Sequence, residues 1–530
     1  MAEALVDALM QVLTPMSLLM MVIGVALGFV VGILPGLGGA VTLALLLPFT
    51  FDMDPVPAFA LLLGMYVVAA TAGDITSVLF GIPGEASSAA VVLDGYPMTR
   101  RGRAGRALGA VLTSSGMGAL FGALVLVLLI PVIRPVIMNI AEPEFFALAV
   151  LGLTFVVTLS SGKMLKGALA CIVGLLVSLV GLDPFTSQQR FTFGSMDLWD
   201  GISIVPVVIG LFGGAEVLQL MMQKRSVASR QAGTPAVSGV GAGIRDALKR
   251  WPLATRSGAI GSGLSLVPGM GGSVAQFVAY GHAKSVSKKP EEFGKGSVEG
   301  VIAAGATGVA KDCGSLIPTV AFGIPGSASS AVLLSAFLIL GLDPGKEMLT
   351  TELDVTMSFV WIALFATVIA IGVALALVRP LAKLTHISGP LLVPFLMLLL
   401  SIGAFAENNA WTDVFLMLVF VAIGVACIRW DWPRVPLLLG FVLGAVLESN
   451  LFLSGQLFGA GWITRPVVIG VGVVIAAVLV MHFVREARTR QRKTSVKKAV
   501  AETAERDPAD PVLTTTAPGE SPDVSEGDKR

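Results

Sequence analysis

Two matched pairs of glycine- and proline-rich motifs are the parts of this sequence whose residue types and spacing predict chemistry. Each motif interrupts an apolar segment, which leaves backbone N–H and C=O groups without their helical partners. Such breaks persist in apolar surroundings only where protein or a wet cavity covers them. The pairs are Pro35–Gly39 with Pro268–Gly272, and Phe80–Ala89 with Phe322–Ala331.

The half-helices expected after these breaks predict an anion-binding site. A helix N-terminus presents free N–H groups and a partial positive charge, so it holds an anion without a fixed cation. No basic residue lies inside the motifs, and the serines after two of the breaks suit N-cap positions. We expect a small carboxylate-bearing substrate, while the unwound carbonyls suit Na⁺. The predicted substrate-binding residues are Pro35, Gly36, Gly38, Gly39, Pro83, Gly84, Ser87, Ser88, Pro268, Gly269, Gly271, Gly272, Pro325, Gly326, Ser329 and Ser330.

The same motifs also permit a purely structural interpretation. Glycine and proline allow kinks and close packing of helices, and a single Pro-Gly pair is explained by that alone. Four motifs that recur in the same order favour the binding site.

Charged residues beside the breaks are the candidates for ion coupling. Each of the longer motifs contains the tripeptide Ile-Pro-Gly, at 82–84 and 324–326, and is called an IPG motif. Asp74 precedes the first IPG motif, and Lys311 with Asp312 precedes the second. Ionisable groups at membrane depth are costly and usually functional, so Asp74 and Asp312 are predicted to ligate a cation or carry a proton. The alternatives are internal pairing, in which Lys311 neutralises Asp312, and a water-exposed position for Glu85.

The composition predicts that lipid is the solvent of this chain. Of 530 residues, 55% are hydrophobic and 13% are charged, against roughly 25% charged in a soluble domain. The net charge of +1 gives no support to nucleic acid as a partner. The three cysteines and three histidines are scattered, so we expect no metal site, no bound cofactor and no enzyme.

The hydrophobic pattern predicts the fold class. Several apolar stretches are shorter than the ~20 residues of a straight span, and Pro-Gly clusters break them rather than polar loops. We predict an all-α polytopic membrane protein of about 11–14 membrane segments, with re-entrant hairpins or discontinuous helices and two inverted-topology repeats. A weaker echo, of Pro206, Gly210 and Gly214 by Pro436, Gly440 and Gly444, extends the repeat.

The charges of the loops predict how the halves are oriented. The arginine-rich loop 100–106 follows the first IPG motif and is expected to be cytoplasmic. The equivalent loop 341–354 is acidic and is expected outside, so the halves are inverted; a parallel duplication would need an extra crossing. The predicted segments are a first repeat at 1–222, a cytoplasmic linker at 223–256, a second repeat at 257–453, a further transmembrane helix at 454–485 and a disordered cytoplasmic tail at 486–530. The N-terminus is expected outside. The basic residues of the tail are expected to fix its cytoplasmic position, and contact with the anionic head groups of membrane lipid is the alternative.

These motifs resemble the large membrane subunit of the tripartite tricarboxylate transporter family. The similarity covers roughly residues 1–485. It runs through Gly32–Gly39, Ile82–Ser88 with Asp94–Pro97, Leu159–Lys163, Gly210–Phe212 with Glu216, and the second IPG motif.

The resemblance implies a multi-pass protein of the bacterial inner membrane that imports tricarboxylates or related organic acids by symport with Na⁺ or H⁺. It also implies two partners, a small four-helix membrane subunit and an extracytoplasmic solute-binding protein that delivers the acid. Asp74 and the Lys311–Asp312 pair depart from the small or amide-like residues expected in the family, which leaves both ions open. An elevator-like motion of the hairpin-bearing part is a further hypothesis.

Two other classes of function are the alternatives. A channel-like anion pore would show unitary currents across a bilayer. An intramembrane enzyme would need a nucleophile–base pair or a metal cluster, which the scattered histidines and cysteines disfavour.

Overall fold

The computed structural model describes residues 1–32, 38–85, 88–158, 164–183, 185–222, 239–267, 272–384, 389–482 and 484. Regular structure in these residues is helical apart from one short pairing, in which β1 (Gly181–Leu182) runs antiparallel to β2 (Gln189–Arg190). The tail from 486 and residues 223–238 of the predicted linker lie outside the described residues.

The described helices are distributed over the two predicted repeats and the linker between them. The first half contains α1 (Ala2–Val12), α2 (Pro15–Gly32), α3 (Gly39–Leu46), η1 (Leu47–Thr50), α4 (Pro55–Phe80), α5 (Ala89–Arg100), α6 (Ala104–Met138), α7 (Glu142–Thr158), α8 (Met164–Ser178), η2 (Met196–Leu198), α9 (Ile204–Val208), the π-helical η3 (Ile209–Gly214) and α10 (Ala215–Met222). The predicted linker contains α11 (Val240–Lys249). The second half contains α12 (Trp251–Ser265), α13 (Gly272–Val286), η4 (Pro290–Glu292), α14 (Val298–Phe322), α15 (Ala328–Ile339), η5 (Glu347–Leu349), α16 (Leu353–Leu384), α17 (Gly389–Asn408), α18 (Trp411–Arg429) and α19 (Arg434–Phe458), and η6 (Gly459–Thr464) follows it.

The described helices confirm the prediction of an all-α polytopic membrane protein. Six of them are long and apolar enough to cross a membrane, judged by length and composition, and six further apolar helices are shorter. The six long ones are Pro15–Gly32, Pro55–Phe80, Ala104–Met138, Leu353–Ala376, Trp411–Arg429 and Arg434–Thr464. The short helices include α15 and the Gly39–Thr50 segment, each of which follows a glycine-proline break, so the breaks account for their length.

Helix α4 is almost wholly buried, which explains why it is apolar on every side. Its neighbours include α2, α5 and α16. The rings of Phe59 on α4, Phe337 on α15 and Phe359 on α16 pack together, with centroids 4.7–5.7 Å apart. The segment that leads into the first Ile-Pro-Gly motif is thus a 26-residue helix and not the short arm of a re-entrant hairpin.

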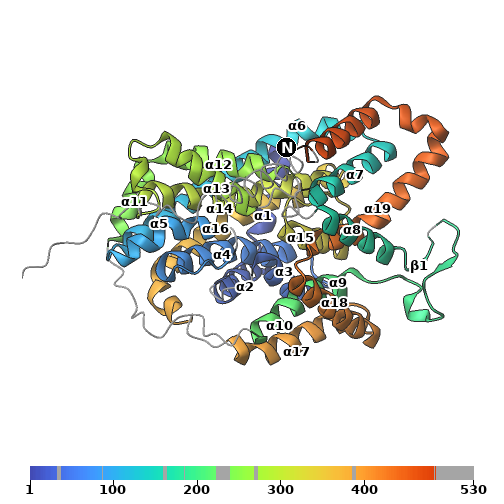
Figure 1. Cartoon of the computed structure of the whole chain (residues 1–530), viewed down its shortest axis with the longest axis horizontal. Coiled ribbons are helices and arrows are strands. Elements are labelled where there is room, and N and C mark those ends of the chain that lie inside the picture. Colours follow the sequence, from blue (N-terminus) through green and yellow to red (C-terminus); the bar gives the residue numbers. More distant parts are fainter. Residues whose placement is uncertain are drawn as a thin grey trace, which may run out of the picture. The chain divides into compact units, whose positions relative to one another are not determined.

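Helices of one half pack on helices of the other half, and each such contact has an equivalent in which the two halves exchange roles. Helix α4 packs on α16 while α14, its equivalent in the second half, packs on α6. Likewise α3 contacts α15, and α13 contacts α5. Figure 1 shows α13 and α14 beside α4 and α5, although these segments are far apart in the sequence. Such exchanged pairs are what two related halves produce when they face each other; the opposite orientation of the halves and their boundaries remain predictions.

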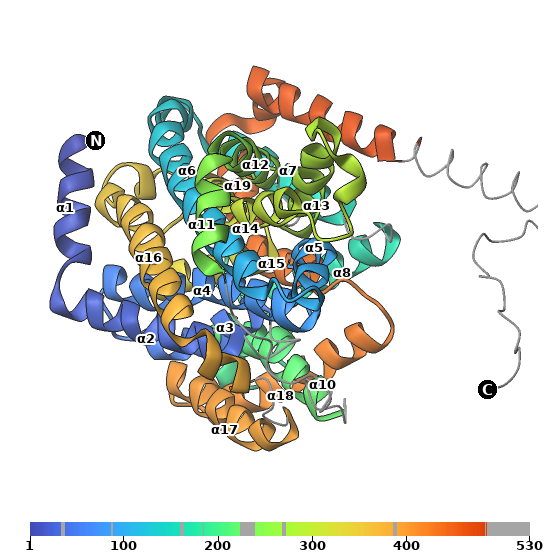
Figure 2. The same ribbon diagram turned by 90° about the vertical axis from the view of Figure 1, so that its left-hand side faces the viewer.

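The described helices also divide into two groups by their contacts. Helices α2, α4, α6, α12, α14 and α16 pack on one another and form the first group. In the second group α7 and α8 pack with α19, and α10 packs with α17 and α18 (bottom of Figure 2); α9 contacts α17, α18 and α19 and so connects these two sets. The glycines of the weaker echo serve close packing inside the second group, because a Cβ on Gly440 would lie 2.2 Å from the Cys171 carbonyl oxygen. Helices α3 and α15 contact each other and helices of both groups.

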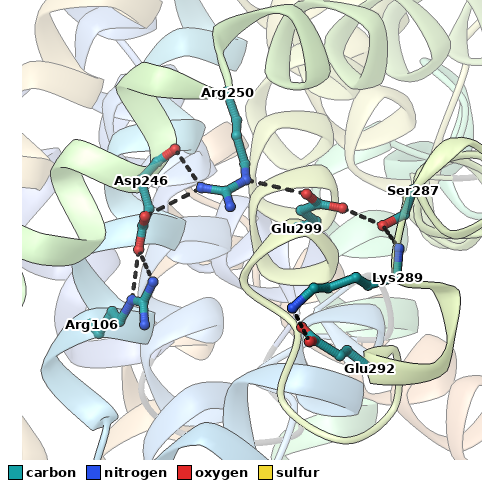
Figure 3. Close-up of polar contacts among 7 residues, drawn as sticks. All are labelled: Arg106, Asp246, Arg250, Ser287, Lys289, Glu292 and Glu299. Carbon is teal, nitrogen blue, oxygen red and sulfur yellow. Dashed lines mark hydrogen bonds and ion pairs between the residues drawn. The ribbon is translucent and has the colours of Figure 1, made fainter.

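A polar network fastens the described part of the linker to the first group (Figure 3). The Arg106 Nε donates to Asp246 on α11 at 2.6 Å, and Arg250 lies 3.2 Å from the same carboxylate and 3.3 Å from Glu299. Beside it, Ser287 donates to Glu299 at 2.6 Å. Helix α11 also packs backbone to backbone on α6, so the second part of the predicted linker is an ordered helix of this network.

One further ion pair in Figure 3 lies at the surface. The Lys289 ammonium donates to Glu292 at 2.9 Å, and this hydrogen bond lowers the pKa of the Glu292 carboxyl. Both side chains are more than half exposed, so water screens the pair and its contribution to stability is small.

Candidate functional site

The two IPG motifs form the turns between helices, as their composition predicts. Helices α4 and α14 end at Gly81 and Gly323, whose φ angles of +69° and +65° only glycine adopts without strain. Pro83 and Pro325 follow two residues later, where proline cannot continue a helix. The same local chemistry therefore makes the same turn in both halves.

The first turn is held by close contacts between backbones. A Cβ on Gly84 would lie 2.4 Å from the Gly73 Cα and 2.8 Å from the Gly32 carbonyl oxygen. No side chain fits there, so Gly84 rests directly on α4 and on the last residue of α2. This close approach places the turn against the end of α2, immediately before the Pro35–Gly39 break.

The second turn repeats this contact in the other half. A Cβ on Gly326 would lie 2.8 Å from the Ser265 carbonyl oxygen and 3.0 Å from the Ser315 Cβ. Ser265 is the last residue of α12, as Gly32 is of α2, and Ser315 takes the place of Gly73. Each IPG turn thus packs against the helix that precedes the glycine-rich break of its own half.

The two halves meet where α3 begins beside α15. A Cβ on Gly39, the first residue of α3, would lie 3.1 Å from the Ser329 Oγ and 2.9 Å from the Tyr66 ring. Gly38 precedes it at the N-cap position, and a Cβ built on Gly38 would meet no atom of the described residues within 4 Å. A break of the first half therefore opens beside the IPG motif of the second half, with open space at Gly38.

A buried polar cluster runs from this meeting point toward the first IPG turn. The Tyr66 hydroxyl donates to Asp312 Oδ1 at 2.6 Å, and the Lys311 ammonium donates to the same oxygen at 2.8 Å. The Lys311 Nζ also lies 3.5 Å from Glu85, the residue after Gly84. Tyr66, Lys311 and Asp312 are each at most 5% exposed. The cluster of Tyr66, Asp312, Lys311 and Glu85 thus connects the two helix breaks.

Asp74 lies beside this cluster but is held differently. Its side chain is 2% exposed, and its Oδ1 has no hydrogen-bond partner among the described residues. Ser88 and Gln276 lie near it. A Cβ on Gly308 would lie 3.3 Å from Gln276 Nε2 and 3.8 Å from Asp74 Oδ2, and a Cβ on Gly73, the residue before Asp74, would lie 3.0 Å from Ser88 Oγ. Asp312 also has one oxygen, Oδ2, without a partner in the described chain.

The expected serine caps are partly wrong. Ser88 stands at the N-cap position of α5, but its backbone is helical and its side chain makes no capping bond. Helix α15 is capped by Ser327, whose Oγ accepts from the Ser330 N–H at 3.1 Å. Ser330 is instead tied to α14, because its Oγ donates to Ser315 at 2.8 Å. Ser327, the capping residue, directly follows Gly326, and Ser330 comes three residues later. This Ser-x-x-Ser spacing was the signal in the sequence for the cap.

Part of the predicted site lies outside the described residues. This holds for Pro35, Gly36, Ser87, Pro268, Gly269 and Gly271. Gly272 is the first residue of α13. Among the residues that are described, the structure brings Gly39, Ser329 and the polar cluster together. The role of all these residues in binding stays a prediction.

One buried carboxylate had no role assigned from the sequence. Asp94 on α5 is fully buried and accepts from the Gly296 and Ser297 N–H groups at 2.7 and 2.8 Å. The Tyr280 hydroxyl donates to its other oxygen at 2.9 Å. Asp94 thereby fastens the helix after the first IPG turn to the start of α14.

The described residues hold no group of three or more histidine, cysteine, aspartate or glutamate side chains that could bind a metal ion. Comparison with known proteins identifies the kind of protein instead. The model of the tripartite tricarboxylate transporter TctA family matches residues 18–439. The chain belongs to this family.

Two relatives from Agrobacterium vitis support the assignment of this TctA-family protein. An uncharacterized 52.8 kDa protein in the TAR-I ttuC' 3' region is 33% identical over 490 residues, which cover 92% of this chain and 97% of the relative. An uncharacterized protein in the TAR-II ttuC' 3' region is 30% identical over 235 residues, or 43% of this chain and 97% of the relative. No solved structure matches the chain.

The family confirms the resemblance found in the sequence. The TctA-family protein is a component of a tripartite tricarboxylate transporter, not an enzyme, and its apolar helices make it a multi-pass membrane protein. A tripartite transporter also implies a small membrane subunit and a binding protein as partners.

Proposed function

We propose that this protein is the membrane subunit that carries a tricarboxylate or related organic acid across the membrane, with the flux coupled to Na⁺ or H⁺. The observation that carries the proposal is the contact of Gly39 with Ser329, from which the cluster of Tyr66, Asp312, Lys311 and Glu85 extends. Backbone N–H groups at helix starts and a buried ion cluster lie next to each other, as coupled binding of an anion and a cation requires.

The proposed binding groups are the free N–H groups at the starts of α3 and α15, with the serines beside them. The open space at Gly38 leaves room for a carboxylate beside the start of α3. The matching breaks of the second half would supply the other wall of the site. Asp74 and Asp312 are the proposed coupling residues.

The packing supports an elevator-like motion as the transport step. Helices α3 and α15 contact both helix groups, so a shift between the groups would carry or expose the site. We place the protein in the bacterial inner membrane, with the N-terminus outside and the tail in the cytoplasm. A small four-helix subunit and an extracytoplasmic binding protein would complete the transporter.

The test is uptake by the complete three-component transporter in proteoliposomes. The binding protein is first exposed to a panel of mono-, di- and tricarboxylates that includes citrate, and the acid it retains is the labelled substrate. Accumulation that requires both the binding protein and an ion gradient supports the proposal. Gradient-independent equilibration refutes it, and unitary currents would favour the channel-like pore.

Serine variants on one helix test the position of the site. Ser330→Ala is expected to reduce the uptake rate more than it reduces protein abundance. Ser335→Ala is the matched control, because Ser335 is also buried on α15 but only donates to the Ala331 carbonyl within its own helix. Equal uptake rates for the two variants would contradict the proposed site.

A further inference from the structure

Buried acids outnumber buried bases in the region of the polar cluster. Asp74 and Asp312 are buried carboxyls, Glu85 beside them is partly buried, and Lys311 is the one ammonium that the described residues place among them. Charge at membrane depth is costly, so groups without a counter-charge must acquire one or be neutralised. The cluster therefore needs a mobile cation or a proton in addition to Lys311.

Lys311 already occupies the position where a mobile cation would be bound by Asp312. Its Nζ is 2.8 Å from Asp312 Oδ1 and 3.5 Å from Glu85. The Tyr66 hydroxyl donates to the same Asp312 oxygen at 2.6 Å. The fixed ammonium on Oδ1 already neutralises Asp312, although its Oδ2 has no partner among the described residues, so Asp312 has less need of a mobile ion than Asp74.

Asp74 is the carboxyl that no cation neutralises. It forms no ion pair with any described residue, and its Oδ1 has no hydrogen-bond partner in the described chain. The charged groups that face it are Glu85 from the IPG turn, and Lys311 and Asp312 from α14. The neighbouring Ser88 and Gln276 are neutral. A proton needs only one carboxyl oxygen, and Asp74 offers one that has no partner among the described residues.

We infer that the coupling ion is a proton carried by Asp74, and that Lys311 is a built-in cation that takes the place of Na⁺. The inference rests on the proposed transport function and selects one of its two ions. A proton would bind the Asp74 carboxylate from the side of uptake and leave to the cytoplasm, while the Lys311–Asp312 pair stays intact. No bond other than the O–H bond of Asp74 forms or breaks.

The wild-type transporter gives the first test, without any substitution. Uptake of the acid retained by the binding protein is measured with a proton gradient in Na⁺-free buffer, and separately with a Na⁺ gradient at equal pH. A gradient of about one pH unit supports roughly tenfold accumulation for each proton coupled to net uptake. A pH dye inside the vesicles should report proton entry that depends on the substrate.

The variant Asp74→Asn gives the second test. It removes the titrating group at nearly constant shape, so accumulation should fall to equilibration while exchange of internal for external substrate stays within about twofold. Asp413→Asn is the control, because Asp413 is also a buried aspartate but lies on α18, where Asn408 donates to it at 3.0 Å. This control should keep proton-driven accumulation.

The outcomes separate the inference from the proposed function. Accumulation driven by Na⁺ alone, or unchanged accumulation by Asp74→Asn, overturns the inference and leaves ion-coupled transport intact. Equilibration under every gradient refutes the proposed function itself. Lys311→Gln should lose proton-driven accumulation, and Lys311→Arg should keep part of it. Unchanged accumulation by Lys311→Gln would overturn the role of the lysine.

Discussion

The hydrogen bonds that Asp94 accepts from Gly296, Ser297 and Tyr280 give the sharpest test of the packing between the two halves. Asp94→Ala removes the acceptor of two backbone N–H groups and of the Tyr280 hydroxyl. Hydrogen bonds to a charged group contribute about 1.5–3 kcal/mol each, and their effects overlap, so we expect destabilisation of about 3–5 kcal/mol. Asp94→Asn keeps the shape and one acceptor and should cost less.

The α14 side of this contact can be perturbed independently of Asp94. A Cβ on Gly300 of α14 would lie 2.2 Å from Asp94 Oδ2 and 2.8 Å from the Tyr280 ring. Gly300→Ala should therefore destabilise the protein by about 1–3 kcal/mol through overpacking. In the double variant the Asp94 carboxylate is gone, so the new methyl group meets the Tyr280 ring alone of these two close neighbours. The destabilisation of the double variant should therefore be smaller than the sum of the two single destabilisations, by about 1–2 kcal/mol.

The assay is the midpoint of heat-induced unfolding in detergent, compared at one heating rate because membrane proteins commonly unfold irreversibly. Asp94→Ala should lower the midpoint by several degrees, and Gly300→Ala by less. Gly281→Ala on α13 is the matched control, since its Cβ would meet no atom within 4 Å. If Gly300→Ala behaves like Gly281→Ala, or if the two destabilisations simply add, the contact between α5 and the start of α14 is refuted.

Two further predictions concern the other contacts between helices. Gly84→Ala should abolish uptake, because its methyl group would collide with the Gly73 backbone, whereas Gly263→Ala on α12 has open space and should transport normally; similar uptake by both would refute the close approach of the IPG turn. Asp246→Ala breaks the link between Arg106 and Arg250 and should destabilise by about 1 kcal/mol, while Lys289→Ala should leave the unfolding midpoint unchanged. Equal midpoints for these two variants would show that the Asp246 network contributes nothing.

The turns of the fold could be predicted because their cause is local. A glycine that must adopt a left-handed conformation, followed two residues later by a proline, stops a helix wherever it occurs. Phe80–Gly84 and Phe322–Gly326 therefore make the same turn in both halves. The fold class followed in the same way from the low charge content and the apolar segments.

The roles of individual polar residues could not be predicted, because they depend on neighbours distant in sequence. Glu85 and Ser327 occupy equivalent positions, yet Glu85 approaches Lys311 and Ser327 caps its own helix. Nothing in the sequence distinguishes Tyr66 from the other residues of its apolar helix. Its role follows from α14, which places Asp312 within hydrogen-bonding distance of its hydroxyl. Asp94 likewise acquires its role only when the loop before α14 lies against α5.

The same dependence distinguishes two aspartates that looked alike in the sequence. Asp74 and Asp312 each precede an IPG motif, and both were candidates for ion coupling. They do not occupy equivalent positions in the repeat, however, and only Asp312 has the Lys311 ammonium and the Tyr66 hydroxyl on one oxygen. A residue that must bind and release an ion in each cycle cannot keep a fixed cation, because the two would compete for the same oxygen. Asp74 is buried beside the cluster and forms no ion pair with a described residue, which is why we propose that it, rather than Asp312, alternates between two states.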